Sequence, residues 1–390
     1  HSGGPPMNDA LPPPTLQPGD RVTLRVDDLA FGGEGVGRIG GFVIFVAFTI
    51  PGERVEAELT EVGKKHGRGR LVRVMEASPD RVVPPCPCFG QCGGCQYQHL
   101  AYEAQLRWKQ RQVTELLGRL GGLPPEAVRP VVPCPAPYGY RNRLMVRSQR
   151  HRREGRLVVG FQRRAGREVL DVEASLLAER ELNDQRARRR AEPPARGGLK
   201  RVLRKAPPDW DVPPDSFFQN NFHLLPGLVA TVRGRLQAGG ARHLVDAYCG
   251  VGFFALELAD LVESFAGVEI DGHAIAAARR NAARRGITHG EFVAGPAEAL
   301  LPGLLERFPA GATAVVVDPP RVGCAPAFLA ALRAVRPAQV LYVSCHPATL
   351  ARDLQRLVAD GAGRVGAGTP LDMFPQTQHV ECVADLRFAR

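Results

Sequence analysis

The sequence predicts a multidomain α/β protein with an N-terminal OB-like β-barrel, a small central α+β domain that carries a cysteine cluster, and a C-terminal Rossmann-like domain. Three observations predict this organisation. Short apolar runs separated by glycines fill the first 77 residues, four cysteines crowd together near residue 90, and apolar runs alternate with helical segments after residue 215. We expect a disordered tail at 1–16, the barrel at 17–77, the central domain at 78–214 and the C-terminal domain at 215–390.

The charge of the chain is concentrated in its middle. The whole sequence has 51 Lys and Arg against 40 Asp and Glu, and residues 141–205 alone hold 20 basic against 8 acidic residues. Clustered basic residues are typical of a surface that binds a polyanion such as RNA, and the alternative is a solvated basic surface. No apolar run approaches the roughly 20 residues of a membrane span. We expect a cytoplasmic monomer with no membrane partner.

The barrel is expected from four segments. Polar and apolar residues alternate over 21–26, the glycines of 32–37 indicate turns, and 42–48 and 55–62 are apolar enough for further strands. Short strands joined by glycine turns favour a small closed barrel. The stretch resembles a TRAM domain, an RNA-binding barrel, although a barrel of this size could equally dock a protein.

The cysteine cluster points to a bound metal group. Several thiolates within ten residues, separated by glycines that let the backbone wrap tightly, fit an iron–sulfur cluster or a tetrahedral zinc. In a cytosolic chain such crowding favours metal binding over disulfides. The candidate ligands are Cys86, Cys88, Cys92 and Cys95.

A cofactor loop follows the proline-rich linker at 207–214. The run Leu244–Phe254 has an apolar strand, a turn with Gly250 and Gly252, and the start of a helix, so the backbone can approach a ligand closely. A second strand ends at Glu269, whose carboxylate suits the two hydroxyls of a ribose. The loop alone fits a dinucleotide or S-adenosylmethionine (SAM).

Three reactive side chains follow further along the same domain. Asp318 ends an apolar strand and precedes two prolines, which restrict its geometry. Cys345 ends the apolar run Val340–Ser344, and Glu381 lies in a segment, 377–383, that we expect to begin another strand. Ligands bind at the carboxyl edge of such sheets, so the three should converge there. A single cysteine at a strand end is more often a buried apolar residue, and only this company favours a nucleophile.

Together these residue types suit methylation of a pyrimidine. Addition of a thiolate to C6 of uracil makes C5 nucleophilic enough to take a methyl group from SAM. A base must then remove the C5 proton before the thiol leaves. We expect Cys345 to be the nucleophile and Glu381 the base, with Asp318 orienting the base or acting on Cys345. A paired uridine would have to be flipped out to reach this pocket.

The motif series resembles the bacterial RNA (uracil-5-)-methyltransferases. The resemblance covers nearly the whole chain and rests on Phe218-Gln219-Asn220, Asp246-x-Tyr248-Cys249-Gly250-x-Gly252, Asp318-Pro319-Pro320-Arg321-x-Gly323, Val343-Ser344-Cys345-x-Pro347 and His379-Val380-Glu381. It implies that Gln219, Tyr248, Glu269 and Asp318 bind SAM, that Cys345 is the nucleophile and that Glu381 is the general base. Where relatives have Asn or Asp near the adenine, this chain has Gly295-Pro296-Ala297.

The resemblance also bears on the metal and on the substrate. The spacing of Cys86, Cys92 and Cys95 looks like the cluster segment of these enzymes, which implies a 4Fe-4S cluster. The family's fourth cysteine corresponds to Ser175 here, so Cys88 or Cys134 would have to replace it. Members that carry the barrel commonly methylate 23S ribosomal RNA, so that substrate is expected, with transfer RNA as the alternative.

Other functions stay open at this point. The spacing Cys88-x3-Cys92-x2-Cys95 is also that of radical-SAM enzymes, some of which carry a TRAM domain, and this alternative predicts a half or full α/β barrel beyond the cluster. A cytosine C5-methyltransferase would more typically show a Pro-Cys pair after its fourth strand. An RNA-binding assembly factor with a degenerate enzyme domain is the third alternative, and Cys345 with Glu381 argues against it.

Overall fold

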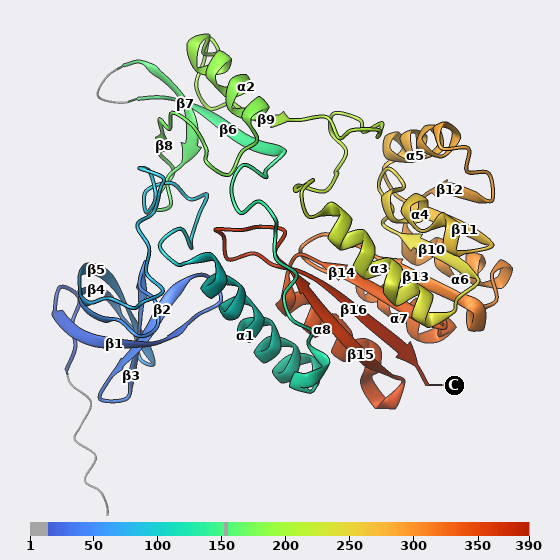
Figure 1. Cartoon of the computed structure of the whole chain (residues 1–390), viewed down its shortest axis with the longest axis horizontal. Helices are drawn as coiled ribbons and strands as arrows, with labels where there is room; N and C mark the ends of the chain where they lie inside the picture. Colours follow the sequence, from blue (N-terminus) through green and yellow to red (C-terminus); the bar gives the residue numbers. More distant parts are fainter. Residues whose placement is uncertain (1–14, 152–154, 390) are drawn as a thin grey trace, which may run out of the picture.

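The computed structural model describes residues 15–151 and 155–389, so the predicted tail at 1–16 lies almost wholly outside the described residues. The chain forms a barrel, a central sheet and a large α/β domain (Figure 1), which confirms the predicted fold class. No helix in the described part of the chain is long and apolar enough to cross a membrane.

The N-terminal barrel is closed by five strands in the order β1-β2-β3-β5-β4. Its core comes from alternate residues such as Leu24, Val26, Ile44 and Val46, all at most 3% exposed. The predicted turn region is partly wrong, because only its first residues turn and strand β2 begins at Glu34. The strands are β1 (Arg21–Leu29), β2 (Glu34–Ile39), β3 (Phe42–Ala47), β4 (Arg54–Val62) and β5 (His66–Glu76).

The central part is a four-stranded sheet in the order β8-β7-β6-β9, with one helix, α2, on one face. Leu144, Val146 and Leu203 on the sheet pack with Leu182 of α2. The other face carries Met145 and Val202, which are 52% and 41% exposed. The elements are β6 (Arg143–Arg150), β7 (Leu157–Gln162), β8 (Val169–Leu170), α2 (Arg180–Ala191) and β9 (Lys200–Arg204).

The C-terminal domain contains a seven-stranded sheet in the order β12-β11-β10-β13-β14-β16-β15, in which β12 to β14 run parallel and β16 runs antiparallel to both of its neighbours. Helices cover both faces, so a strand such as β13 (Thr313–Val317) is buried along its whole length. The other strands are β10 (His243–Ala247), β11 (Ser264–Glu269), β12 (Gly290–Ala294), β14 (Gln339–Ser344), β15 (Gly363–Leu371) and β16 (Glu381–Phe388).

The helices around this sheet fall into two groups. Those whose side chains join the core on one face include α6, α7 and α8, and those on the other face are α3, α4 and α5. Helix α1 (Tyr102–Gly121) packs against α8 and shares its core, although it precedes the central sheet in the chain. The remaining bounds are α3 (Leu225–Gly239), α4 (Phe253–Glu257), α5 (Gly272–Arg284), α6 (Ala297–Arg307), α7 (Pro326–Val335) and α8 (Pro347–Val358).

The segment 86–99, which we call the cysteine segment, touches all three parts of the molecule. Phe89 packs edge-on against Phe48 of the barrel, with ring centroids 5.2 Å apart, and the Gly93 amide donates to the Gln162 carbonyl of β7. The amides of Gln96 and Tyr97 both donate to the carbonyl of Gln376, at 3.0 Å each. The cysteine segment therefore joins the barrel, the central sheet and the loop before β16.

The loop before β16 is also tied to α1. Lys109 and Asp372 are fully buried, and Lys109 Nζ donates to Asp372 Oδ1 at 2.6 Å and to the Phe374 carbonyl at 3.1 Å. Residues 377–380, predicted as the start of a strand, belong to this loop, and the strand begins only at Glu381. Glu381 therefore follows a loop that is held in place by its contacts with α1.

Candidate active site and cysteine pocket

The cofactor loop lies between β10 and α4. Tyr248, Gly250 and Gly252 have φ angles of +62°, +54° and +86°, and a Cβ at Gly252 would approach the ring of Phe292 to 2.8 Å. Glycine is therefore required at 252 both by the backbone and by the close contact. Asp246 lies beneath the loop, where its Oδ2 accepts from the Ala255 amide of α4. It holds the helix and does not face the cavity.

The predicted ribose acceptor, Glu269, ends β11. Its Oε2 accepts from the Gly250 amide at 3.2 Å and its Oε1 from the Asp271 amide at 3.0 Å. Each oxygen keeps a further lone pair. The carboxylate is therefore fixed at the edge of the sheet and can still accept hydrogen bonds from a ligand.

A cavity of about 500 Å³ opens at the same edge. Tyr248, Glu269 and Ile270 line it, and Ile270 is 74% exposed, which leaves an apolar surface for a flat ring. Gly295, Pro296 and Ala297 also line it, followed by Glu298. This cavity could hold the adenosine part of SAM.

Gln219 and Asp318 meet beside this cavity. Gln219 Nε2 donates to Asp318 Oδ2 at 3.1 Å, and the Asn142 amide group holds Gln219 by donating to its carbonyl at 2.9 Å. Burial raises the pKa of Asp318, and the hydrogen bond from Gln219 opposes that rise. The linker after the central sheet thus supplies a polar partner to the strand-end acid.

The sheet edge also brings Cys345 and Glu381 together. Cys345 follows β14 and is half-buried, whereas Glu381, the first residue of β16, is 4% exposed. Burial, and then the nearby Glu381 carboxylate, raise the pKa of Cys345 to about 11. Burial and the neighbouring Asp318 likewise raise the pKa of Glu381. The thiol of Cys345 and the carboxyls of Glu381 and Asp318 therefore lie close enough to influence one another.

Two residues at this site were quoted in the motif series without a role. Arg321 lowers the pKa of Cys345 through its charge and a hydrogen bond, and its charge also favours ionised Glu381. Arg321 Nη2 lies 2.6 Å from His379 Nδ1. Burial, and then Arg321, lower the pKa of His379 to about 3, so the imidazole is neutral and can accept from the guanidinium. The sequence could have indicated that Arg321 belongs to the site, because Arg321 lies only three residues after Asp318.

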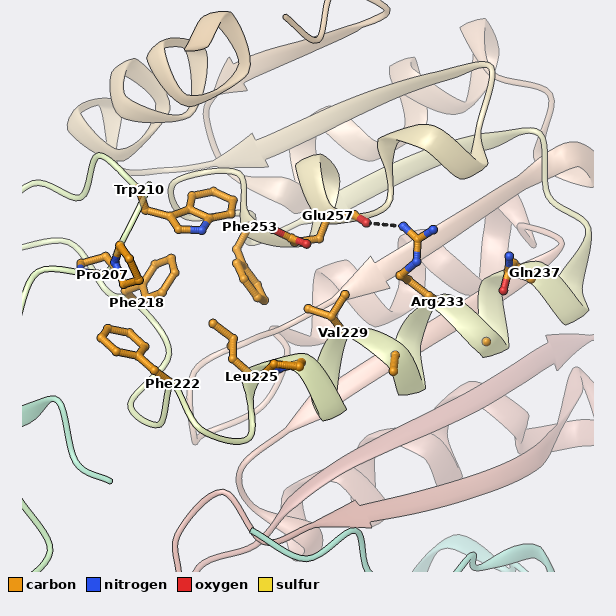
Figure 2. Close-up of a pocket in the computed structure, with 14 residues that line it drawn as sticks. Pro207, Trp210, Phe218, Phe222, Leu225, Val229, Arg233, Gln237, Phe253 and Glu257 are labelled. Atoms are coloured by element: carbon orange, nitrogen blue, oxygen red, sulfur yellow. Dashed lines mark hydrogen bonds between the residues drawn. The ribbon is translucent and has the colours of Figure 1, made fainter. Parts of the chain in front are cut away.

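A second cavity, of about 650 Å³, lies between α3, α4 and the linker (Figure 2). Trp210, Phe218 and Phe253 form an aromatic wall, and Arg233 is held at the rim by a hydrogen bond from Nη1 to the Glu257 carbonyl. Cys345, Asp318 and Glu381 do not line it. The reactive groups therefore face the sheet edge and not this apolar cavity.

The four predicted metal ligands line one small pocket of about 50 Å³. Ser175 of the central part lines it too, whereas Cys134 is buried in the C-terminal core, where it accepts from the Asn221 side chain. Within residues 15–151 and 155–389, no group of three or more potential ligands is arranged to hold a metal ion. The structure therefore does not support the predicted metal site as it stands, and of the two substitutes for Ser175 only Cys88 is in place.

The surroundings of this pocket nevertheless suit a thiolate-bound anion. Gln98 Nε2 donates to Cys95 Sγ at 3.1 Å, and the charge of Arg141 opposes the rise that burial causes in the pKa of Cys92 and Cys95. On the other side, buried Arg186 has two nitrogens without hydrogen-bond partners. The four thiols and the charges of Arg141 and Arg186 suit an iron–sulfur group, although the sulfurs are not arranged around a single metal position.

The parallel sheet with its glycine loop, the carboxylate of Glu269 at the end of β11 and the adjoining cavity is the arrangement of a SAM-dependent methyltransferase. The tRNA (Uracil-5-)-methyltransferase family model matches residues 209–387, and a TRAM domain matches residues 16–72. Two similar proteins are RNA methyltransferases described as uncharacterized. That of Halalkalibacterium halodurans is 33% identical over 94% of this chain and 97% of its own, and that of Gloeobacter violaceus is 36% identical over 96% and 98%.

The chain therefore belongs to the RNA (uracil-5-)-methyltransferase family, as the sequence motifs predicted. A solved relative is the tRNA (uracil-54, C5)-methyltransferase of Pyrococcus abyssi in complex with S-adenosyl-L-homocysteine, with a TM-score of 0.69 and 26% identity over 94% of this chain and 100% of that one. The radical-SAM alternative is wrong, because a seven-stranded methyltransferase sheet follows the cysteine segment where that alternative required an α/β barrel.

Proposed function

We propose that this protein forms 5-methyluridine in RNA through a covalent bond between Cys345 and C6 of a flipped-out uridine. The observation that carries the proposal is the convergence of Cys345, Glu381 and Asp318 at one sheet edge beside the SAM cavity. Thiol, base and cofactor space are the three parts that this reaction needs.

The chain's own residues divide the reaction into balanced steps. The Cys345 sulfur forms a bond to C6, and the displaced electron pair gives C5 the character of an enolate carbon. When bound, SAM would supply the methyl group that C5 takes, and the bond between that methyl group and the sulfonium sulfur would break to leave S-adenosylhomocysteine. Glu381 then removes the C5 proton, the electrons of that bond restore the C5–C6 double bond, and the S–C6 bond breaks. Arg321 assists by favouring the thiolate of Cys345.

In this scheme Asp318 acts through Glu381 and does not itself take the C5 proton. Its carboxyl accepts from Gln219 and its charge raises the pKa of Glu381, so a carboxylate at 318 makes Glu381 a stronger base. A stronger base removes the C5 proton more readily. The two acids are thus not interchangeable, and only Glu381 is placed at the start of β16 next to Cys345.

RNA would bind across the open face of the central sheet. Met145 of β6 and Val202 of β9 are paired and point outward on this face. The basic pair Arg147 and Lys200 lies at one side of them, and Arg143 lies at the other end of β6. Exposed apolar side chains bordered by cations offer contacts to bases and phosphates at once. Of the basic runs in the sequence, Arg152 and Arg153 lie outside the described residues.

For the substrate we propose 23S ribosomal RNA, on the family resemblance that links it to the N-terminal barrel. Transfer RNA is the competing substrate, because the Pyrococcus abyssi relative, a tRNA (uracil-54, C5)-methyltransferase, matches 94% of this chain. The barrel alone does not separate the two.

We also propose a 4Fe-4S cluster bound by Cys86, Cys88, Cys92 and Cys95, with Cys88 in place of the family's cysteine at position 175. All four thiols and Ser175 line the same pocket, and Cys86 and Cys92 are near enough to raise the pKa of Cys88. Asp318, Cys345 and Glu381 do not line this pocket, so the cluster takes no part in the methyl transfer steps above.

The test is incubation of the protein with labelled SAM and either 23S ribosomal RNA or bulk transfer RNA, followed by nucleoside analysis. We expect label in 5-methyluridine from ribosomal RNA and none with the Cys345→Ala variant. Label in transfer RNA alone would show that transfer RNA is the substrate. Label in 5-methylcytidine would show that cytosine is the methylated base. No labelled pyrimidine in any RNA would leave only the RNA-binding assembly factor.

A further inference from the structure

One arginine of the central part is buried where its neighbours on the same helix are exposed. Helix α2 carries Arg186, Arg188, Arg189 and Arg190, and only Arg186 has an exposed fraction of 0%. The helix is otherwise highly polar. A side chain of this length and charge is almost never fully buried without a partner that compensates the charge.

The described residues provide only part of that compensation. Arg186 Nη1 donates to the Glu173 carbonyl, and its guanidinium lies 5.6 Å from the centre of the Phe161 ring. Its Nε and Nη2 have no hydrogen-bond partner. The nearby carboxylate of Asp171 is held by Arg190 and Arg156 instead. Nε and Nη2 of Arg186 are therefore buried donors without an acceptor, which is costly unless a bound group compensates them.

The cysteine pocket lies beside this guanidinium. Phe161, which contacts Arg186, lines the pocket, and so does Ala174, the neighbour of Glu173. Cys88 lines the same pocket as Phe161 and Ala174. Arg141 lines the pocket too, together with Cys92 and Cys95. The four thiols therefore have Arg141 in the pocket lining and Arg186 behind Phe161.

We propose that Arg186, together with Arg141, supplies the buried counter-charge of a thiolate-bound iron–sulfur centre in this pocket. This inference rests on the cluster proposed above. Four thiolates outweigh the positive charge of an iron–sulfur core, so the bound centre is an anion that needs cations in a setting without water. Arg186 is a positioning and charge-balancing residue, and it does not ligate the metal.

The consequence concerns the properties of the centre and not methyl transfer. A nearby cation favours the more negative, reduced form, so loss of Arg186 lowers the reduction potential. It also leaves the thiolates less stabilised, which speeds loss of iron to a chelator. A purely packing role for Arg186 would change folding stability without a charge-dependent shift of potential.

The experiment compares the full-length protein with Arg186→Met, Arg186→Gln and Arg186→Lys after anaerobic reconstitution with ferrous iron and sulfide. Iron and sulfide per chain, the rate of iron loss to a chelator and the midpoint potential are measured. We expect the neutral Met and Gln variants to lose iron several-fold faster and to have a lower potential, while Lys stays near the wild type. Arg189→Met, a change to an exposed arginine on the same helix, is the matched control.

Equal iron retention and potential in the wild type and the Gln variant would overturn the inference, and so would a wild type that takes up no iron. If Arg186→Met does not fold, the Gln and Lys pair still separates charge from packing. Uridine methylation is assayed separately on the same samples. A wild type that methylates RNA without binding iron refutes this inference and leaves the proposed methyl transfer standing.

Discussion

The molecule has two cysteine sites, and they are built in opposite ways. Cys345 lies at the end of β14, and its partners Asp318 and Glu381 follow or begin neighbouring strands of the same sheet. The cysteine pocket combines one loop with Arg141, Phe161 and Ser175 of the central part. The topology of the sheet brings the first site together, whereas the second depends on how two separate segments dock. The first should therefore tolerate losses in the second.

The largest expected effect is that of Cys345→Ala. In the proposed reaction the thiolate of Cys345 is the nucleophile, so methyl transfer should fall by about a thousand-fold or more, while binding of S-adenosyl-L-homocysteine is unchanged. Single-turnover transfer of labelled methyl and calorimetric titration measure the two. Cys92→Ser in the other site is the comparison, and it should retain transfer. Substantial activity in the Cys345 variant would exclude the covalent route.

Replacement of the base should separate the two halves of the reaction. Glu381→Gln cannot take the C5 proton, so turnover should drop by roughly 100- to 10,000-fold while a protein–RNA adduct accumulates. Denaturing gels with labelled RNA reveal the adduct as a slower band. Loss of turnover without any such band would assign proton removal to another group.

The open face of the central sheet should contribute to RNA affinity and not to chemistry. Arg147→Ala removes one phosphate contact, so the slope of log K against log salt should become shallower by about one unit. Filter binding across a salt series measures it. Arg364→Ala, an exposed change near the start of β15, is the control, and an equal effect there would move the RNA surface elsewhere.

The pH dependence should show the shared environment of the reactive edge. The proposed reaction needs Cys345 as thiolate and Glu381 as carboxylate, and the pKa of each is raised, so the single-turnover rate should increase as pH rises through the neutral range and above. Arg321 lowers both, and Arg321→Gln should move the rising limb to higher pH. A rate that is flat with pH in the wild type would contradict this assignment.

The smallest expected effect lies in the cysteine pocket. Ser175→Cys places a fifth thiol in the pocket, so iron should be retained longer against a chelator with little change in methyl transfer. Cys134→Ser, in the methyltransferase core, should leave retention unchanged. Faster loss of iron from the Ser175 variant would argue against room for another ligand there.

The sequence located the ends of β13 and β14 because the signals for a strand end are local. An apolar run that ends in Asp318 or Cys345 marks a strand end, and parallel strand ends meet at one edge by topology. The start of β16 was predicted too early, because residues 377–380 belong to a loop in which the His379 amide donates to Thr377 Oγ1.

Long-range partners could not be predicted in this way. Arg186 belongs to a run of arginines whose pattern indicates an exposed basic helix, and nothing local marks it as the buried member. Its burial depends on the docking of α2 onto β7 and on the loop that carries Glu173. The Lys109–Asp372 pair spans 263 positions and is equally invisible to periodicity.

The carbonyl of Gln376 accepts hydrogen bonds from two amides of the cysteine segment, and the same loop ends five residues later at Glu381, the proposed base. Both hydrogen bonds are made by backbone amides, so they do not depend on which side chains occupy positions 86, 88, 92 and 95. Chemical change of the sulfurs should therefore leave the start of β16 in place.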